Sequence, residues 1–371
     1  MSNTPYTYNF NPGPAKVPKE VLQKAQDELI YYRESGISVF EMSHRSPEFE
    51  GIINNAENLL REVLNIPSNY RVLFLHGGGT GQFASIPLNL TAPGEKANYV
   101  ITGAWSEKAA KEAEKYIKVN RVNPKPAKFV SIPDRATWNV DPEGKYLFYT
   151  DNETIHGVEY PAPVAPFSEN MPVVFDMTSN FLTRPVDVTN YGAIIAGTQK
   201  NAGVAGLAIV IVRDDLIGRP QTICPSILDY KVLLANQSLY NTPPTYSIYM
   251  TGLFLQWIKD QGGLEEMSRR ADARAKLVYD VIDQSNGFYS CAVEPTARSR
   301  VNACFRVGGP SGDEALEKKF FEQAKERRFV GVKGHRSVGG VRISMFNACP
   351  LSDAQTIADM MVQFQKENQK K

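Results

Sequence analysis

Seven short apolar runs, mostly separated by helical or loop segments, constrain the fold of this chain more than any other feature. We expect these runs to be strands at 72–75, 99–102, 117–122, 146–150, 173–175, 193–196 and 208–212. Strands that alternate with helices are typical of a largely parallel sheet covered on both faces. The run at 208–212 follows its predecessor so closely that we expect it to be antiparallel. The sequence therefore predicts an α/β fold with a mostly parallel seven-stranded sheet.

Patterns on either side of these runs indicate further elements. An extended, proline-rich segment at 6–18 comes first, and helical patterning follows at 19–34 and 48–64. A long helical stretch at 246–285 follows the sheet region and is interrupted at Gly262-Gly263. Because glycine disfavours the interior of a helix, we expect one helix to end there and a second unit to begin.

The remainder of the chain is expected to be a smaller α+β domain. Its predicted strands lie near 288–293, 302–307, 328–332 and 341–345, and its predicted helices near 313–327 and 352–367. The length of 371 residues also favours two domains. We assign residues 16–262 to the large domain, and residues 263–371 together with the N-terminal segment 1–15 to the small domain.

Composition and charge argue against several classes of protein. A net charge of +1 gives no general signal for nucleic acid, so any anion binding has to be local. No apolar run approaches membrane-spanning length, and the first residues lack the pattern of a signal peptide. The scattered cysteines predict free thiols rather than disulfides or a zinc site; they are Cys224, Cys291, Cys304 and Cys349. We expect a soluble cytoplasmic protein without a metal, a nucleic-acid partner or a membrane partner.

Polar residues follow most of the predicted strands at the point where each strand ends. In an open α/β sheet, ligands bind at the carboxyl ends of the strands. The residues found there are the loop 76–82, Trp105, the segment 151–154, Asp176, Gln199 and Lys200. We therefore expect one crevice that combines backbone amides, an indole ring, a hydroxyl, a carboxylate and an amine.

Lys200 and Asp176 are the most informative pair among these residues. Lys200 follows an apolar run that stops at Gly197, and Asp176 closes the run Pro172-Val-Val-Phe. Pyridoxal phosphate chemistry requires such a pair, because a lysine amine forms the Schiff base and a carboxylate pairs with the pyridinium nitrogen. The alternative is a solvated lysine and an acid that caps a helix or turn. The polar groups at the other strand ends favour the first interpretation.

The loop Gly77-Gly78-Gly79-Thr80-Gly81 leads from a predicted strand into a predicted helix. Glycines let the backbone approach a phosphate, and the start of a helix offers free N–H groups. The alternatives are a plain tight turn and a dinucleotide fingerprint, Gly79-x-Gly81-x-x-Ala84. The next strand ends on Ile101-Thr102 rather than on a ribose-binding acid, and the loop does not continue into the Gly-Lys-Ser/Thr of a P-loop. A phosphate cradle without a nucleotide fits better.

Trp105 and two His-Arg pairs complete the set of candidates. Trp105 comes just past a strand end and belongs either to the core or to a site where it stacks on a planar ring. The pairs His44-Arg45 and His335-Arg336 lie in turn-like segments, and Arg342 follows the second pair. Such pairs are often plain surface, but arginine presents a fork that matches carboxylate and phosphate oxygens. We expect an anion pocket for a small substrate with two anionic groups.

On these residues, the chain resembles the phosphoserine aminotransferase family, in class V of the pyridoxal phosphate enzymes. The resemblance extends nearly end to end and includes two family-specific motifs, Gly334-His335-Arg336 and Asn241-Thr242-Pro243-Pro244. Further matching segments are 9–15, 41–45, 77–82, 102–106, 152–154, 176–180 and 199–201. The resemblance implies a type I pyridoxal phosphate transferase fold, with a large cofactor-binding domain and a smaller C-terminal α+β domain.

The resemblance also implies a role for each candidate residue. Lys200 would form the Schiff base, Asp176 would pair with the pyridinium nitrogen, and Trp105 would stack on the ring. Contacts to the phenolic oxygen and phosphate of the cofactor would come from Thr154, Gly79, Thr80 and Gln199, joined by Asn241 and Thr242 from the neighbouring subunit of a homodimer. Substrate phosphate and carboxylates would bind His44, Arg45, His335, Arg336 and Arg342. Two positions depart from the common pattern, Thr80, where arginine, cysteine and other residues occur, and Asp151, where a small residue is common.

The function implied by the resemblance is transamination between L-glutamate and 3-phosphohydroxypyruvate, which gives 2-oxoglutarate and O-phospho-L-serine in serine biosynthesis. In this ping-pong reaction the Lys200 amine would move a proton as general base and acid. Two other functions stay open. A cysteine desulfurase would need a reactive cysteine on a mobile loop, and Cys349 has no obvious counterpart role. A non-catalytic phosphate- or dinucleotide-binding module would show no cofactor colour.

Overall fold

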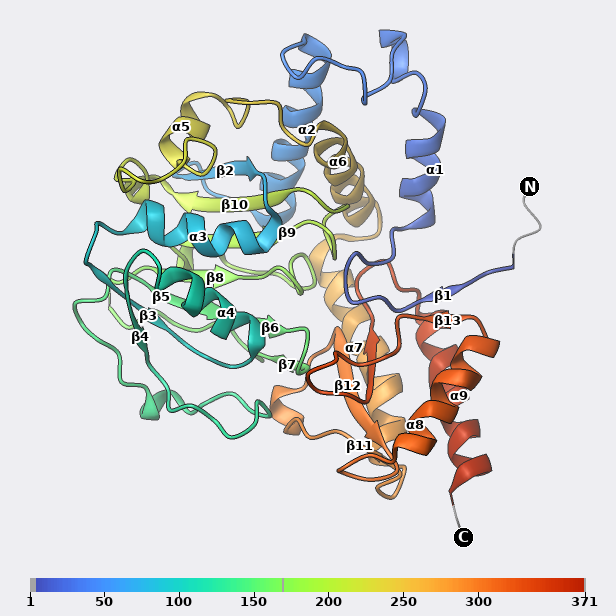
Figure 1. Ribbon diagram of the computed structural model, residues 1–371. Helices are drawn as coiled ribbons and strands as arrows, with labels where there is room; N and C mark the ends of the chain where they lie inside the picture. Colours follow the sequence, from blue (N-terminus) through green and yellow to red (C-terminus); the bar gives the residue numbers. More distant parts are fainter. Residues whose placement is uncertain (1–4, 169, 370–371) are drawn as a thin grey trace.

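The chain folds into a large lobe built on a seven-stranded sheet and a smaller lobe built mainly from the C-terminal part of the chain (Figure 1). The computed structural model describes residues 5–168 and 170–369. The predicted α/β fold with a mostly parallel seven-stranded sheet is confirmed. The domain boundary at residue 262 stays a prediction, and residues 1–4 and 370–371 of the predicted small domain lie outside the described residues.

The strands of the large sheet lie in the order β2-β10-β9-β8-β5-β3-β4. Their bounds are β2 Tyr70–Leu75, β3 Lys96–Tyr99, β4 Lys118–Arg121, β5 Leu147–Thr150, β8 Val173–Asp176, β9 Ala193–Gly197 and β10 Ala208–Arg213. β10 pairs antiparallel with both of its neighbours, which confirms the prediction from its short connection to β9. The pairs among the other strands are parallel, so the carboxyl ends of these strands meet at one edge.

The register of the central strands decides which residues share that edge. Thr150 at the end of β5 lies opposite Asp176 at the end of β8. Asp176 in turn lies opposite Ile195 on β9, and Lys200 sits in the turn that follows β9. The sheet therefore brings a hydroxyl, a carboxylate and an amine from three adjacent strands to neighbouring positions.

Helices cover both faces of the sheet, and alternate residues of each strand pack against different helices (Figure 1). On β8, Phe175 belongs to the hydrophobic cluster of α2 and α6, whereas Val174 belongs to the cluster of α3 and α4. The bounds of these helices are α2 Pro47–Leu64, α3 Gly78–Leu90, α4 Ala104–Ala113 and α6 Thr245–Asp260. Burial on both faces explains why these strands form unbroken apolar runs rather than alternating ones.

Two predicted elements have bounds that differ from the expected ones. The helix predicted at 19–34 ends at Asp27, so α1 spans Lys19–Asp27. Beyond it, within the predicted range, Ile30 and Tyr31 are 67% and 63% exposed, and only Tyr32 packs into the core of the large lobe. The strand predicted at 99–102 is β3, which spans Lys96–Tyr99 and therefore lies three residues earlier in the chain. The backbone N–H and carbonyl of Ile101 bond to the side chain of Asn123 instead of to a neighbouring strand.

The small lobe packs helices against a three-stranded antiparallel sheet of order β11-β12-β14. Its elements are α7 Gly263–Asp283, β11 Tyr289–Ser290, β12 Asn302–Val307, α8 Glu314–Glu326, β14 Val341–Ser344 and α9 Leu351–Asn368. α6 and α7 are separated at Gly262 and Gly263, which have φ values of 102° and 75°. Glycine adopts this left-handed region without strain, so the predicted break at these residues is confirmed.

The strand predicted near 328–332 does not join this sheet. It is β13 Phe329–Val330, which pairs in parallel with β1 Tyr8–Asn9. Phe10 follows β1 and packs into the hydrophobic cluster of the small lobe. The N-terminal segment is therefore attached to the small lobe through a pairing between the two ends of the chain.

Several short elements were not predicted. They are α5 Tyr230–Ala235, the hairpin β6 Asn152–Glu153 and β7 Val158–Glu159, and 3₁₀ turns at Arg33–Ser35, Arg135–Thr137, Val188–Asn190, Asp214–Leu216 and Pro295–Ala297. No helix among the described residues combines the length and the apolar character that a bilayer crossing requires. All four cysteines are free thiols.

Buried polar contacts fix the two lobes to each other beside the carboxyl ends of the strands. Asn152 Nδ2 donates hydrogen bonds of 2.8 Å to Ser179 Oγ and to Asn302 Oδ1 of the small lobe. Ser299 Oγ donates a further bond of 2.5 Å to Asn152 Oδ1. These side chains are at most 3% exposed, so the bonds form away from competing water.

Candidate active site

A cavity of about 320 Å³ opens at the carboxyl ends of the parallel strands. Both lobes contribute to its walls, because β14 and the loop before it reach across from the small lobe. The predicted site residues that line it are Gly79, Thr80, Trp105, Thr154, Asp176, Gln199, Lys200, His335 and Arg342. The strand ends therefore meet in one crevice, as the sequence predicted.

Lys200 extends from the turn after β9 into this cavity and is 7% exposed. Its Nζ donates a hydrogen bond of 2.6 Å to Thr154 Oγ1. Burial lowers the pKa of Lys200 to about 7; the charges of Asp176 and Glu153 act against this shift, and that of Arg342 acts with it. Near neutral pH, much of the amine is therefore unprotonated and able to act as a nucleophile or a base.

Asp176 lines the same cavity and is 3% exposed. Burial raises the pKa of its carboxyl, whereas hydrogen bonds from Thr178 and the charge of Lys200 lower it. One of these bonds joins the Thr178 backbone N–H to Asp176 Oδ1 at 2.9 Å. An amine and a carboxylate thus share a desolvated space, where each reduces the free-energy cost of charging the other.

The glycine-rich loop brings the start of α3 close to the segment that carries Asp176. Gly77, with φ of 85°, turns the chain from β2 into the helix. A Cβ at Gly79 would lie 2.9 Å from Thr178 Oγ1, so a larger residue would push the loop away. The first N–H groups of a helix have no intrahelical acceptor, and here they lie at the cavity wall. This arrangement is typical of a phosphate site.

Trp105 forms a wall of the cavity, and its ring lies near the catalytic candidates. Lys200 Nζ is 6.0 Å from the ring centroid, and Lys108 Nζ on α4 is 4.3 Å from it. The Trp105 Nε1 atom is buried and has no partner within the described residues. The ring is therefore placed beside the cavity rather than wholly within the core.

Glu153 holds Trp105 in place, although the sequence analysis assigned no role to Glu153. Its carboxylate is fully buried and accepts hydrogen bonds from the backbone N–H groups of Trp105, at 2.9 Å, and Ser106, at 2.8 Å. Ser106 Oγ donates a third bond of 2.6 Å. A Cβ at Gly103 would overlap this carboxylate, so only glycine allows the approach. A carboxylate near the N-terminus of a helix is electrostatically favourable. Glu153 lies far from α4 in the sequence, so no local sequence pattern indicates this contact.

Arg342 and His335 reach the cavity from the small lobe. Arg342 is 6% exposed; its Nη1 donates a bond of 3.3 Å to the carbonyl of Thr154, and its Nε has no partner within the described residues. A buried guanidinium with spare donors attracts an anion. His335 Nδ1 accepts a bond of 3.2 Å from the Ser337 N–H, so the proton of the neutral ring lies on Nε2. Burial and then Arg342 lower the pKa of His335.

The other predicted anion-binding residues do not line this cavity. Arg336 is exposed beside His335. His44 and Arg45 lie in the turn before α2, where Arg45 is exposed and His44 Nε2 is buried with no partner within the described residues. The fold of one chain thus brings His335 and Arg342 together and leaves these three apart, so their roles stay predictions.

Asn241 and Thr242 also lie away from the cavity, in the loop between α5 and α6. Asn241 Nδ2 is 3.2 Å from the Nε2 atom of His76, at the start of the glycine-rich loop. Thr242 is exposed. The resemblance assigns this pair to the site of a neighbouring subunit, and that assignment stays a prediction.

The residues of the cavity fit pyridoxal phosphate on structural grounds. A buried amine and a buried carboxylate meet at one cavity, as the aldehyde and the ring nitrogen of the cofactor require. The close approach of Gly79 to Thr178 places the first turn of α3 at the cavity wall, where Gly79 and Thr80 line the space that a phosphate would occupy. The Trp105 ring, with its unpartnered Nε1, supplies a flat wall.

Comparisons with known proteins agree with this site. Residues 7–355 match the model of the class-V aminotransferase family. A phosphoserine aminotransferase of Drosophila melanogaster is 52% identical over 97% of this chain and 99% of its own. The solved phosphoserine aminotransferase of Bacillus circulans subsp. alkalophilus is 41% identical, with a TM-score of 0.93 and coverage of 98% and 99%. That of Trichomonas vaginalis, solved with pyridoxal phosphate bound, is 38% identical, with a TM-score of 0.91 and coverage of 96% and 100%.

The fold and the site define an aminotransferase of class V. Within that class, the chain belongs to the phosphoserine aminotransferase family.

The lowered pKa of Lys200 predicts how its reactivity depends on pH. Below about pH 7 the amine is protonated and cannot add to an aldehyde, so reductive methylation of the cofactor-free protein should accelerate as the pH rises through about 7. Exposed lysines, with an ordinary pKa of about 10.4, should accelerate only at alkaline pH. Mass spectrometry of the Lys200 peptide measures the rate. A midpoint in the alkaline range would contradict the proposed effect of burial.

The Glu153 bonds predict the effect of a nearly isosteric change. Glu153→Gln replaces one acceptor oxygen by an amide NH₂ that faces backbone donors, which should lower the free energy of unfolding by about 1–3 kcal/mol. Urea unfolding measures this value, and Trp105 fluorescence reports on the ring. The control is Glu322→Gln, at an exposed position of α8, for which we expect less than about 0.5 kcal/mol. Equal effects of the two changes would refute the proposed role of Glu153.

Proposed function

We propose that this protein is a phosphoserine transaminase, which moves the amino group of L-glutamate to 3-phosphohydroxypyruvate and gives O-phospho-L-serine and 2-oxoglutarate. The observation that carries the proposal is that Lys200, Asp176 and Arg342 share one cavity and are each at most 7% exposed. Amino transfer between an amino acid and a keto acid requires an amine, an acid and a group that binds carboxylate. The named relatives support the phosphorylated substrate.

The cofactor of the proposed reaction is pyridoxal phosphate. When bound, it supplies a conjugated ring that takes up the electron pair released at the substrate Cα. Lys200 would hold it covalently, Asp176 would pair with its ring nitrogen and Trp105 would stack on its ring. Its oxygens would bond to Thr154, Gly79, Thr80 and Gln199, joined by Asn241 and Thr242 of the partner subunit.

Lys200 is also the proton carrier of the proposed mechanism. Because burial lowers its pKa to about 7, the amine can take a proton from the substrate Cα and give it back near neutral pH. The Thr154 hydroxyl, 2.6 Å from Nζ, orients the amine. Asp176, whose pKa burial raises, places a carboxyl group in the same cavity, where it would pair with the ring nitrogen and keep it protonated.

The anionic groups of the substrate divide between two sets of residues. Arg342 lines the cavity of Lys200, bonds to the Thr154 carbonyl and has an unpartnered Nε donor within the described residues, so we assign it to the α-carboxylate. The His335-Arg336 and His44-Arg45 pairs would hold the distal phosphate or carboxylate. Arginine forks suit both groups, which explains how one site accepts glutamate and a phosphorylated acid.

A homodimer with shared active sites belongs to the proposal. The segment between α1 and α2 exposes large apolar side chains, including Ile30 at 67%, Tyr31 at 63% and Phe40 at 62%. Several large apolar side chains exposed in one segment are typical of a protein interface. Covering it with a second copy would also bring the adjacent His44 and Arg45 to an interface. The cytoplasmic location rests on the absence of a membrane-crossing helix among the described residues and stays a prediction.

The cysteine desulfurase alternative is disfavoured by the environment of the thiols. Burial raises the pKa of Cys349 to about 12 and that of Cys304, on β12, to about 12. Because the thiolate is the reactive form, these thiols are poor nucleophiles at neutral pH. A binding module without catalysis does not require a buried lysine whose pKa is lowered.

Lys200→Ala tests the proposed function most directly. The variant should lose turnover and the visible absorbance of the bound cofactor, because the covalent attachment and the proton carrier are removed together. Circular dichroism should show an unchanged fold. Lys276→Ala, an exposed lysine on α7, is the control and should keep the colour and the activity. A coloured, active Lys200→Ala enzyme would place the anchor on another lysine.

Arg336→Ala and Arg342→Ala should differ in substrate selectivity. A charge-assisted hydrogen bond contributes about 1.5–3 kcal/mol, so Arg336→Ala should lower kcat/KM for phosphoserine at least about tenfold. It should lower that for glutamate less, and hardly change that for alanine, which has no distal anion. Arg342→Ala should lower all three alike, since each carries an α-carboxylate. Half-reactions followed by cofactor absorbance give these ratios. Equal losses for phosphoserine and alanine in Arg336→Ala would mean that Arg336 is structural.

Mixing two inactive variants tests the shared site. A Lys200→Ala subunit and a Thr242→Glu subunit would form hybrid dimers in which one composite site keeps both Lys200 and Thr242. Random exchange should therefore restore about a quarter of the wild-type sites. Activity after mixing, compared with each variant alone, measures the recovery. A fully active monomer in sedimentation would refute the shared site.

A further inference from the structure

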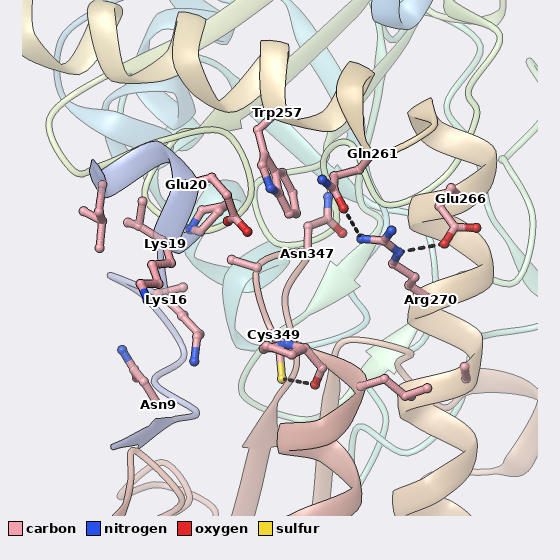
Figure 2. A pocket seen from close by; sticks show the side chains of 18 of the residues that line it. Asn9, Lys16, Lys19, Glu20, Trp257, Gln261, Glu266, Arg270, Asn347 and Cys349 are labelled. Carbon is pink, nitrogen blue, oxygen red and sulfur yellow. Dashed lines mark hydrogen bonds and ion pairs between the residues drawn. The ribbon is translucent and has the colours of Figure 1, made fainter. Parts of the chain in front are cut away.

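A second cavity, of about 960 Å³, has about three times the volume of the first, which is about 320 Å³. It forms where the start of α1, the junction of α6 and α7, and the start of α9 come together, and the N-terminal segment borders it (Figure 2). None of the residues assigned above to cofactor or substrate lines it. The proposed transamination therefore leaves this cavity without a function.

The N-terminal segment separates the two cavities on one side. Gly13 lines the first cavity and Ala15 lines the second. The Ala15 N–H donates a bond of 2.9 Å to the carbonyl of Gln199, the residue before Lys200. A Cβ at Gly13 would lie 3.2 Å from the Cε atom of Lys200, so the segment packs directly on this side chain.

The segment between β14 and α9 separates the cavities on another side. The Phe346 ring centroid is 5.9 Å from Lys200 Nζ. The next residue, Asn347, lines the second cavity, and its N–H donates a bond of 2.9 Å to Oδ1 of Asn201. Both sequence neighbours of Lys200 are therefore held by segments that also form walls of the second cavity.

Among the described residues, the charges that line the second cavity leave an excess of one positive charge when Asp353, the partner of Lys16, is counted with them. On α7, Arg269 and Arg270 share a single carboxylate, that of Glu266, with N···O distances of 2.7 Å. Lys16 pairs with Asp353 at 2.8 Å, and the adjacent Lys19 and Glu20 of α1 carry opposite charges. Figure 2 shows Arg270 bonded both to Glu266 and to Gln261. The cavity is thus suited to a monoanion.

The rest of the wall of the second cavity contains an aromatic ring and, within the described residues, a hydrogen-bond acceptor without a partner. Trp257 of α6 lines the cavity together with apolar residues such as Leu22 and Pro350. Asn347 is 3% exposed, and its Oδ1 has no partner within the described residues, because its Nδ2 already donates to the Leu182 carbonyl at 2.7 Å. Figure 2 shows the Asn347 amide near Trp257 and Gln261. A ligand with a hydrogen-bond donor would satisfy this buried oxygen.

We propose that the second cavity binds small aromatic carboxylates that carry a hydroxyl or amino donor, and that its occupancy is linked to Lys200 through the segments 12–18 and 346–349. The carboxylate faces Arg269 and Arg270, the ring packs on Trp257, and the donor reaches Asn347 Oδ1. A filled cavity holds both segments against Lys200 and its neighbours. This link depends on the position of Lys200 and not on its assigned role in transamination.

Binding is tested with three probes that remove one interaction at a time. Calorimetry and Trp257 fluorescence on the full-length protein should show binding of 4-hydroxybenzoate. The neutral 4-hydroxybenzamide, which lacks the charge, and benzoate, which lacks the donor, should each bind about fivefold or more weakly, as expected for an interaction of about 1 kcal/mol. No binding of 4-hydroxybenzoate, or equal binding of all three probes, would overturn the proposal.

Two variants test the location of the probe. Ala273→Phe fills the cavity from α7 and should abolish binding. Arg270→Gln removes the excess charge and should raise the Kd about fivefold, whereas the control Arg61→Gln should not change it. Arg61 is a matched control because it pairs with Glu57 four residues earlier on α2, as Arg270 pairs with Glu266 on α7. Binding unchanged in Ala273→Phe would place the probe elsewhere and refute the site.

The link to Lys200 has its own measurement. Reductive methylation of Lys200 in the cofactor-free protein should slow about fivefold when 4-hydroxybenzoate saturates the cavity. A factor of this size lies at the lower end of the range that is usual for coupling between two binding sites. In Ala273→Phe the probe should have no effect on this rate. Because the assay needs neither cofactor nor turnover, it separates failure of this link from failure of the proposed function. Binding without any change in the Lys200 rate would refute the link.

Discussion

The removal of the Lys200 amine and the Asp176 carboxylate from water is the constraint on which the rest of the site depends. Burial favours the neutral form of both groups, so it lowers the pKa of Lys200 to about 7 and raises that of Asp176. A buried amine without a charged partner would be costly to protonate, because no nearby group would compensate for the lost hydration of the ammonium ion. The neighbouring carboxylate reduces that cost and leaves the amine poised between its two forms.

The large sheet supplies this constraint, and its strands could be predicted because their signal is local. Burial on both faces makes each strand an unbroken apolar run, and a polar residue marks where the run ends, as Asp176 does on β8. The parallel order then follows from the intervening helices. Lys200, Asp176, Thr154 and Trp105 could thus be placed at one edge of the sheet without knowledge of any contact between them.

The contacts missed by the sequence analysis join residues that are far apart in the chain. The Glu153 carboxylate bonds to the first turn of α4, and β1 pairs with β13 across almost the whole length of the chain. In neither of these two contacts does the local sequence around one partner indicate the other. The same reason explains the helix predicted to continue past Asp27: its apolar residues fit a helical period, but whether they face a core is a tertiary property. The predicted anion pocket is incomplete within one chain, because Arg342 lines the cavity and Arg45 does not, so their joint role stays a prediction.

The segments that enclose Lys200 belong to both lobes, and this gives the small lobe an influence on the reactive amine. The N-terminal segment, which β1 attaches to the small lobe, packs Gly13 on the Lys200 side chain. The chain after β14 places Phe346 near Nζ and bonds Asn347 to Asn201. The buried Asn152 bonds tie the lobes together beside the strand ends, and these two segments add direct contacts to Lys200 and to its neighbour Asn201. Any displacement of the small lobe must therefore change the packing, and with it the hydration and proton affinity, of Lys200.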